Sequence, residues 1–90
     1  MKHATSAALD QLEPLLADIR RRAGLKEKSR GAFYLKSQSL LHFHEDPAGH
    51  FADLRLGDGW QRFAVNSKAD WKVLLAALDT HLKAKGNATT

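Results

Sequence analysis

A strong turn sequence, Asp46-Pro47-Ala48-Gly49, lies between two runs in which apolar and polar residues alternate. Aspartate, proline and glycine at the first, second and fourth positions favour a type I turn. The flanking runs, Ser39–Glu45 and Phe51–Leu56, have the period of two that is typical of β-strands. Because a turn this short joins antiparallel neighbours, these residues predict a β-hairpin at the centre of the chain.

Two further strands are expected beside this hairpin. Phe33–Lys36 precedes it across a polar reversal at Ser37-Gln38. Trp60–Asn66 follows it across a second turn at Gly57-Asp58-Gly59. Every connection is short enough for a hairpin, so the four strands predict an antiparallel meander.

The N-terminal quarter of the chain has apolar residues at the three- and four-residue spacing of an amphipathic helix. They are Leu9, Leu12, Leu16, Ile19 and Ala23. Thr5 or Ser6 is suited to cap this helix, and Gly24 to end it. Pro14 requires either a kink near Leu12 or a regular start at Glu13, because proline in a helix interior removes a hydrogen bond.

A second helix is predicted after the last strand. Ser67 and Asp70 have the spacing of a capping box, with aspartate in place of the usual glutamate. The apolar residues that follow at helical spacing are Trp71, Leu74, Leu75, Leu78 and Leu82. We expect the helix to end near Lys85 and residues 86–90 to form a flexible tail. The fold class is therefore α+β, one domain over residues 1–85 with the order α-β-β-β-β-α.

Turn geometry also predicts which residues face each other across the strands. A symmetric reversal in the central hairpin places His42 opposite Asp53. A two-residue loop at Gly57-Asp58 then places Asp53 opposite Arg62, whereas a four-residue loop would place Arg62 opposite Arg55. In the first register Asp53 is ionised and raises the pKa of His42. Such a polar row either fixes the strand register or forms a small site for an anion or a partner.

Strict alternation assigns the strand residues to two faces of the sheet. One face is mainly apolar and holds Tyr34, Leu41, Phe43, Ala52, Leu54, Phe63 and Val65. The other face mixes aromatic and charged side chains: Phe33, Leu35, Leu40, His42, His44, Phe51, Asp53, Arg55, Trp60 and Arg62. This mixed face is too apolar to stay fully in water, so we expect a helix, a partner or a second copy to cover it.

These features favour a non-enzymatic interaction or accessory domain that uses the mixed face, with a protein partner or as a homodimer. The candidate binding residues are His42, His44, Asp53, Arg55, Trp60 and Arg62. No catalytic residue and no cofactor is predicted, because the glycines lack the strand–glycine–helix context of a phosphate site. A ninety-residue meander is also expected to offer little depth for a pocket of ~300 Å³ or more.

Weak nucleic-acid binding is the second interpretation. Basic residues concentrate in the first third of a chain whose formal net charge is +4. The candidate contacts are Arg20, Arg21, Arg22, Lys26, Lys28 and Arg30. Because acidic residues dilute the first helix and no aromatic–glycine RNA motif is present, we expect at most weak, salt-sensitive binding.

Metal-dependent activity at a histidine pair is the third interpretation. His42 and His44 lie two residues apart, so both side chains point to one face of their strand and can approach one ion. With Asp46 they are similar to the metal motif of metallo-β-lactamase-like hydrolases, but Pro47 stands where that motif has another histidine. Turn chemistry explains Asp46 better, and the sequence alone favours a protein without a metal site.

The chain has no cysteine and no apolar run long enough for a signal peptide or a membrane span. We therefore expect a cytoplasmic protein, without disulfides or a membrane partner, whose core alone stabilises the fold.

One segment of the chain, residues 41–56, has the sequence LHFHEDPAGHFADLRL. It resembles a recurring segment of small bacterial proteins for which no activity is established. The similarity extends over about residues 31–78, roughly half of the chain. It implies a bacterial, cytoplasmic protein and no particular chemistry.

Overall fold

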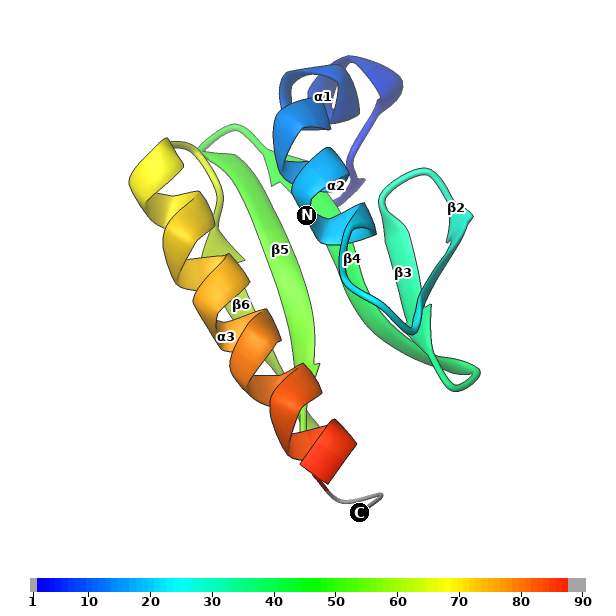
Figure 1. Cartoon of the computed structure of the whole chain (residues 1–90). Helices are drawn as coiled ribbons and strands as arrows, with labels where there is room; N and C mark the ends of the chain where they lie inside the picture. The colour runs from blue at the N-terminus through cyan, green and yellow to red at the C-terminus, as the bar shows by residue number, and fades with distance from the viewer. Residues whose placement is uncertain (1, 88–90) are drawn as a thin grey trace.

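An antiparallel sheet with helices near both ends of the chain forms the α+β fold of the computed structural model, which describes residues 2–87 (Figure 1). The strands are β1 (Lys2–His3), β2 (Leu25–Ser29), β3 (Ala32–Leu35), β4 (Gln38–Asp46), β5 (Gly49–Leu56) and β6 (Gly59–Ala64). The helices are α1 (Ser6–Gln11), α2 (Glu13–Arg20) and α3 (Lys68–Asn87). The predicted class and strand direction are confirmed, but the predicted four strands omit β1 and β2.

The strands follow the order β2-β3-β4-β5-β6, and each is antiparallel to its neighbour. β1 also pairs with β4, on the same edge that β3 uses. β3 contacts β4 from Gln38 to Leu41, whereas β1 contacts it at His44 and Glu45. A gap between β1 and β3 therefore opens along this edge, beside His42 and Phe43.

The reversals predicted at residues 46–49 and 57–59 are confirmed. The first reversal lies at Lys36-Ser37, one residue before the predicted Ser37-Gln38, because Gln38 already pairs with Leu35. At the central turn Asp46 pairs with Gly49, and Asp46 Oδ1 accepts a hydrogen bond from the Ala48 amide at 2.8 Å. At the next turn Leu56 pairs with Gly59, so the loop has two residues. Gly57 has φ +62°, as a glycine-first hairpin turn requires, and this loop sets the register of β6.

The two strands that were not predicted lack the usual sequence pattern. β2 reads Leu-Lys-Glu-Lys-Ser, and charged residues are depleted in most strands but are common on a sheet edge. β1 has two residues, too few for any period. Both form because an edge of another strand offers unpaired backbone groups to them.

A bulge in β4 overturns part of the predicted division into faces. Phe33 pairs with Leu41 but Tyr34 pairs with Ser39, so Leu40 is an extra residue. Phe33 and both leucines are at most 3% exposed and belong to the core. Tyr34 instead lies on the opposite face, and Leu35 packs against the core. Strict alternation had placed Phe33, Leu35 and Leu40 on the mixed face and Tyr34 on the apolar one.

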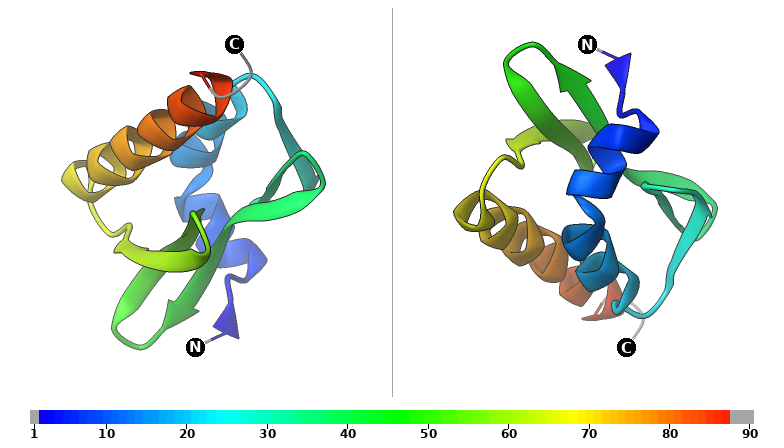
Figure 2. Two further views of the ribbon diagram at one scale, coloured as in Figure 1. Left: turned by 90° about the horizontal axis from the view of Figure 1, so that it is seen from below. Right: turned by 90° about the horizontal axis from the view of Figure 1, so that it is seen from above.

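All three helices pack on one face of the sheet. A single core cluster joins side chains of α1, α2 and α3 with Leu41, Phe43, Ala52 and Leu54 of the strands. Figures 1 and 2 show the helices together on this side, and no described helix covers the other side of β4, β5 and β6. The mixed face is therefore the open face of the sheet, and Trp60 on it is 41% exposed.

The N-terminal helix combines both outcomes expected of Pro14. Thr5 Oγ1 accepts from the Ala8 amide at 3.3 Å and caps α1, which ends at Gln11. Leu12 separates the two helices, and Pro14 lies in the first turn of α2. Pro14 therefore lacks its N–H at a position in the first turn, where a backbone N–H has no partner within the helix in any case.

The C-terminal helix begins with the predicted cap. Ser67 Oγ accepts from the Asp70 amide at 3.1 Å, and the Asp70 carboxylate accepts from the Asn66 amide at 2.9 Å. α3 continues to Asn87, two residues beyond the predicted end at Lys85. The rest of the predicted tail, residues 88–90, lies outside the described residues.

Candidate functional site

The polar row predicted from the turns is present on the open face. β4 and β5 place His42 opposite Asp53, and β5 and β6 place Asp53 opposite Arg62. Arg62 donates through Nε to Asp53 Oδ1 at 2.8 Å and through Nη2 to Oδ2 at 2.9 Å. This bidentate hydrogen bonding from Arg62 lowers the pKa of Asp53, which is only 8% exposed. The carboxylate is therefore ionised, as predicted, and it is also buried.

The Asp53 carboxylate contacts His44 rather than His42. Its Oδ2 lies 3.1 Å from His44 Nε2, and the same Nε2 lies 2.8 Å from His42 Nδ1. Burial, followed by the neighbouring His44, lowers the pKa of His42 despite the attraction of the Asp53 carboxylate. The predicted rise in the pKa of His42 is therefore wrong, and His42 is neutral at pH 7.

A third imidazole lies against this pair. The short strand β1 places His3 opposite His44. The His3 ring stacks on that of His44 with centroids 5.1 Å apart, and its centroid is 6.1 Å from that of His42. One ring nitrogen from each of the three histidines lies within 4.8 Å of the other two. His3 was not predicted, because a two-residue strand leaves no periodic pattern in the sequence.

Two hydrogen bonds after β1 fix His3 over β4. The Ala4 amide donates to the Phe43 carbonyl at 3.1 Å. The Thr5 amide donates to Glu45 Oε1 at 2.6 Å, and this bond lowers the pKa of Glu45. The strand is thus attached to β4 on both sides of the histidine cluster.

His44 has a buried nitrogen whose hydrogen-bonding capacity is unmet. Its Nδ1 has no hydrogen-bond partner among the described residues, whereas its Nε2 faces both Asp53 and His42. A buried polar atom without a partner costs about 1–3 kcal/mol, so native structures rarely retain one without a reason such as a bound ion. The contact with Asp53 also matches the carboxylate–histidine pairs that orient metal-bound imidazoles.

An aromatic residue and an arginine extend the site across the sheet. The Trp60 ring centroid lies 4.7 Å from that of His42, and the Arg55 guanidinium lies 4.6 Å from the Trp60 ring centroid. Arg55 Nε also donates to the Ser39 carbonyl at 3.0 Å. All six candidate binding residues therefore lie on one face, in a continuous series of contacts: His42, His44, Asp53, Arg55, Trp60 and Arg62.

The basic residues considered for nucleic acid lie elsewhere, and the structure pairs most of them. Arg20 contacts Glu13 and Glu27, and Arg30 contacts Asp10 and Glu13. In the same way Arg22 forms a bidentate pair with Asp79 of α3. The remaining contacts are Arg21 with Asp18 at 3.6 Å and Lys28 over the Tyr34 ring at 4.3 Å. Lys26 is exposed. Little of the arginine charge is left for a phosphate backbone.

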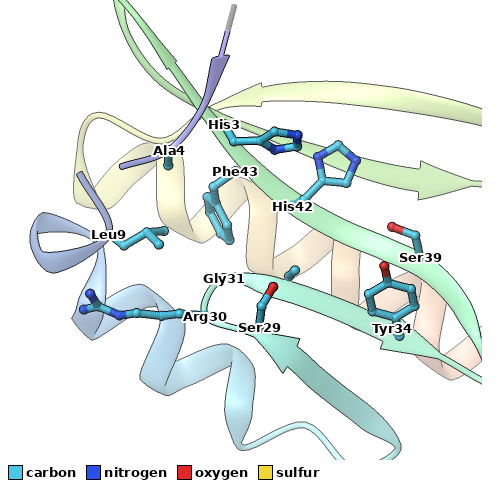
Figure 3. Close-up of a pocket in the computed structure, with 11 residues that line it drawn as sticks. His3, Ala4, Leu9, Ser29, Arg30, Gly31, Tyr34, Ser39, His42 and Phe43 are labelled. Carbon is cyan, nitrogen blue, oxygen red and sulfur yellow. The ribbon is translucent and has the colours of Figure 1, made fainter. Parts of the chain in front are cut away.

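The gap between β1 and β3 is a pocket of about 560 Å³ (Figure 3). His3 and His42 line it next to the histidine cluster, and Leu9 and Phe43 form an apolar part of its wall. The sequence was expected to offer little depth for a pocket of ~300 Å³ or more, and this pocket, which is partly open to solvent, exceeds that size. A meander closed by tight hairpins has no such gap, but two short strands placed end to end along one edge create it.

Comparison of the chain with protein-family models, with curated proteins and with solved structures finds no match. Among residues 2–87, no helix is long and apolar enough to cross a membrane. The geometry of the site therefore carries the functional argument.

Proposed function

We propose that the protein binds a transition-metal ion through His3, His42 and His44. The observation that supports this function is the convergence of three imidazole nitrogens, from two strands, within 4.8 Å of one another. His42 Nδ1 and His44 Nε2 already lie at hydrogen-bond distance, and a metal ion would attract a ring lone pair from each of the three histidines.

The ligand type indicates the class of metal. Imidazole nitrogens suit Zn²⁺, Cu²⁺ and Ni²⁺, while Mg²⁺ and Ca²⁺ prefer oxygen ligands. The ligand must also be neutral, because a proton competes with the metal for the same lone pair. Burial and the adjacent His44 lower the pKa of His42, so its imidazole is neutral at pH 7 and one of its ring nitrogens carries a lone pair. Zn²⁺, with three protein ligands and an open fourth position, fits this set.

Asp53 and Arg62 have a supporting role in this proposal. Asp53 lies within 3.1 Å of His44 and orients its ring. Arg62 balances the carboxylate charge through its bidentate contact, so Asp53 holds the imidazole without neutralising the ion. The row predicted from the turns thus becomes the outer layer of a metal site.

Metal binding fits the open face better than the two other functions considered. The polar groups expected to meet a protein partner are already engaged with one another: Asp53 with Arg62, and Arg55 with Trp60. The arginines considered for nucleic acid are paired with acidic residues. The histidine cluster, by contrast, retains a buried nitrogen without a partner among the described residues.

Equilibrium dialysis against Zn²⁺, followed by elemental analysis, tests the proposal. We expect about one ion per chain, and at least tenfold weaker binding in His3→Ala, His42→Ala and His44→Ala. His50→Ala is the matched control, because His50 lies on β5 outside the cluster, and it should bind as the natural protein does. A natural protein that retains no zinc, or a folded triple variant that retains as much as the natural one, would overturn the proposal.

A further inference from the structure

The pocket beside the histidine cluster is placed to receive a molecule that also contacts the metal. His3 and His42 belong both to the cluster and to the pocket wall. Figure 3 shows their rings on one side of the pocket, with Leu9 and Phe43 on another and the hydroxyls of Tyr34 and Ser39 close together. At about 560 Å³ the pocket falls within the ~300–1,000 Å³ of typical small-molecule sites.

The charge balance of the site favours an anionic ligand at the metal. Three neutral imidazoles leave the charge of a divalent ion uncompensated. Asp53 cannot compensate it, because Arg62 holds that carboxylate in a bidentate pair. Arg30 at the pocket rim is in turn balanced by Asp10 and Glu13. The charge of the bound ion would therefore be the one left without a counter-charge. An anionic ligand at its open coordination position would balance it.

The rest of the pocket wall indicates what is attached to the anionic group. Leu9 and Phe43 are buried apolar side chains, and Ala4 and Ala32 add small apolar surfaces. Gly31 allows the Leu9 side chain to pack closely against the backbone here, because a Cβ at this position would lie 2.9 Å from a Leu9 methyl carbon. Leu9 and Phe43 are almost fully buried and Ser29, Tyr34 and Ser39 line the rest, so the apolar part of the wall is small. It suits a compact hydrocarbon or aromatic body, which gains free energy by leaving water.

We infer that the pocket binds a small organic carboxylate, with its carboxylate on the metal and its apolar body against Leu9 and Phe43. This inference rests on the proposed metal site. It adds the ligand class, and it assigns the pocket residues a role in selecting the body of the ligand rather than its charge.

Titration of the Co²⁺-loaded protein with benzoate and with acetate tests this inference, because the visible absorption of Co²⁺ changes when a ligand enters its coordination sphere. Both probes carry a carboxylate, but only benzoate has an apolar body to bury. We expect saturable binding of benzoate that is at least about tenfold tighter than that of acetate, from burial of the ring.

Ser29→Leu provides the matched variant. Ser29 lines the pocket and is not a member of the histidine cluster, so a larger side chain there narrows the pocket without touching the ligands of the metal. We expect Ser29→Leu to weaken benzoate binding about tenfold or more and to leave acetate binding unchanged. Ser6→Leu, on the exposed start of α1, should change neither.

The outcomes separate the two claims. If neither Co²⁺ nor Zn²⁺ binds, the proposed function itself is wrong. If Co²⁺ binds but benzoate is no tighter than acetate, or Ser29→Leu leaves benzoate unaffected, the metal site stands and the pocket inference is overturned. Equal calorimetric affinity of benzoate for the metal-free protein would also overturn the inference, because the carboxylate would not be on the metal.

Discussion

Asp53 is a nearly buried carboxylate that depends on a half-exposed arginine. The Asp53 side chain is 12% exposed and that of Arg62 50%. Arg62 is its only guanidinium partner among the described residues, and the remaining contact is the His44 ring. Taking a carboxylate out of water is costly unless charged donors replace the water, so the Arg62 contact largely determines whether the charge is tolerated.

Removal of that arginine should destabilise the protein. In Arg62→Ala the Asp53 carboxylate stays buried without its two charge-assisted hydrogen bonds, and we expect the free energy of unfolding to fall. Urea denaturation at pH 7 in the presence of a chelator measures this change without any contribution from metal. Asp53→Ala in the same chain should restore part of the loss, because the orphaned charge is gone. Strictly additive losses would show that the two side chains do not interact.

Among the described glycines, Gly49 is the one at which an added Cβ would make the shortest contact. It has φ +141°, and a Cβ there would lie 2.6 Å from Asn66 Oδ1, the atom that accepts from the His50 amide. We expect Gly49→Ala to lower the free energy of unfolding by about 1 kcal/mol or more. Gly59→Ala, where a Cβ meets nothing within 4 Å, should change it by less than about 0.5 kcal/mol. Equal midpoints for the two variants would contradict this account of the turn.

Among the elements, the β2–β3 hairpin is joined to α2 by two ion pairs, Glu27 with Arg20 and Arg30 with Glu13. Glu27 accepts from Arg20 Nε at 2.6 Å and from the Gly31 amide at 2.8 Å, so it joins helix, strand and turn. The hydrogen bond from Arg20, and then that from Gly31, lowers the pKa of Glu27 against the effect of burial. This contact also positions the pocket wall, because Gly31 lies in that wall.

The lowered pKa of Glu27 makes its contribution to stability dependent on pH. A carboxyl whose pKa is lower in the folded state stabilises the protein above its unfolded value of 4.5, and this contribution is lost as the pH falls through the folded pKa. We expect Glu27→Gln to cost about 1 kcal/mol at pH 6, and less as the pH is lowered below about 4. Urea denaturation of both proteins at several pH values measures the difference, and a cost that is constant with pH would contradict the ionic role.

The elements that tight turns specify could be predicted from the sequence. Asp46-Pro47-Ala48-Gly49 and Gly57-Asp58-Gly59 gave the register that places Asp53 between His42 and Arg62. The bulge at Leu40 was not predictable, because two adjacent leucines fit either face and tertiary burial decides between them. β1 was missed since pairing with β4, rather than its own sequence, makes it a strand.

The candidate site could be predicted only in part, because local alternation and turns reveal two of its histidines but not the third. His42 and His44 share a face by simple alternation, which the structure confirms. His3 joins them only through the pairing of β1 with β4, a contact between residues more than forty positions apart. The pKa of His42 was predicted in the wrong direction because register reveals which charges are near, whereas burial by neighbouring rings depends on side-chain packing.

At the scale of the whole molecule, the helices on one face and the histidine cluster on the other are connected through β4. Its side chains alternate between the core, where Phe43 packs, and the open face, where His42 and His44 lie. β1 pairs with one part of the β4 edge and the β2–β3 hairpin with the other. The site and its pocket lie between these two paired parts. The fold thus supplies a rigid strand for two ligands and a short separate strand for the third.

Zn X-ray absorption spectroscopy on the zinc-loaded protein tests the central claim most directly, because it counts the imidazoles bound to the ion. Three histidine ligands predict three Zn–N contacts at about 2.0–2.1 Å with imidazole scattering, plus one oxygen ligand without ring scattering at the open position. His3→Ala should reduce the imidazole count by one, and His50→Ala should leave it unchanged. A natural protein whose bound zinc shows at most one imidazole, or a count that His3→Ala does not alter, would contradict the three-histidine site.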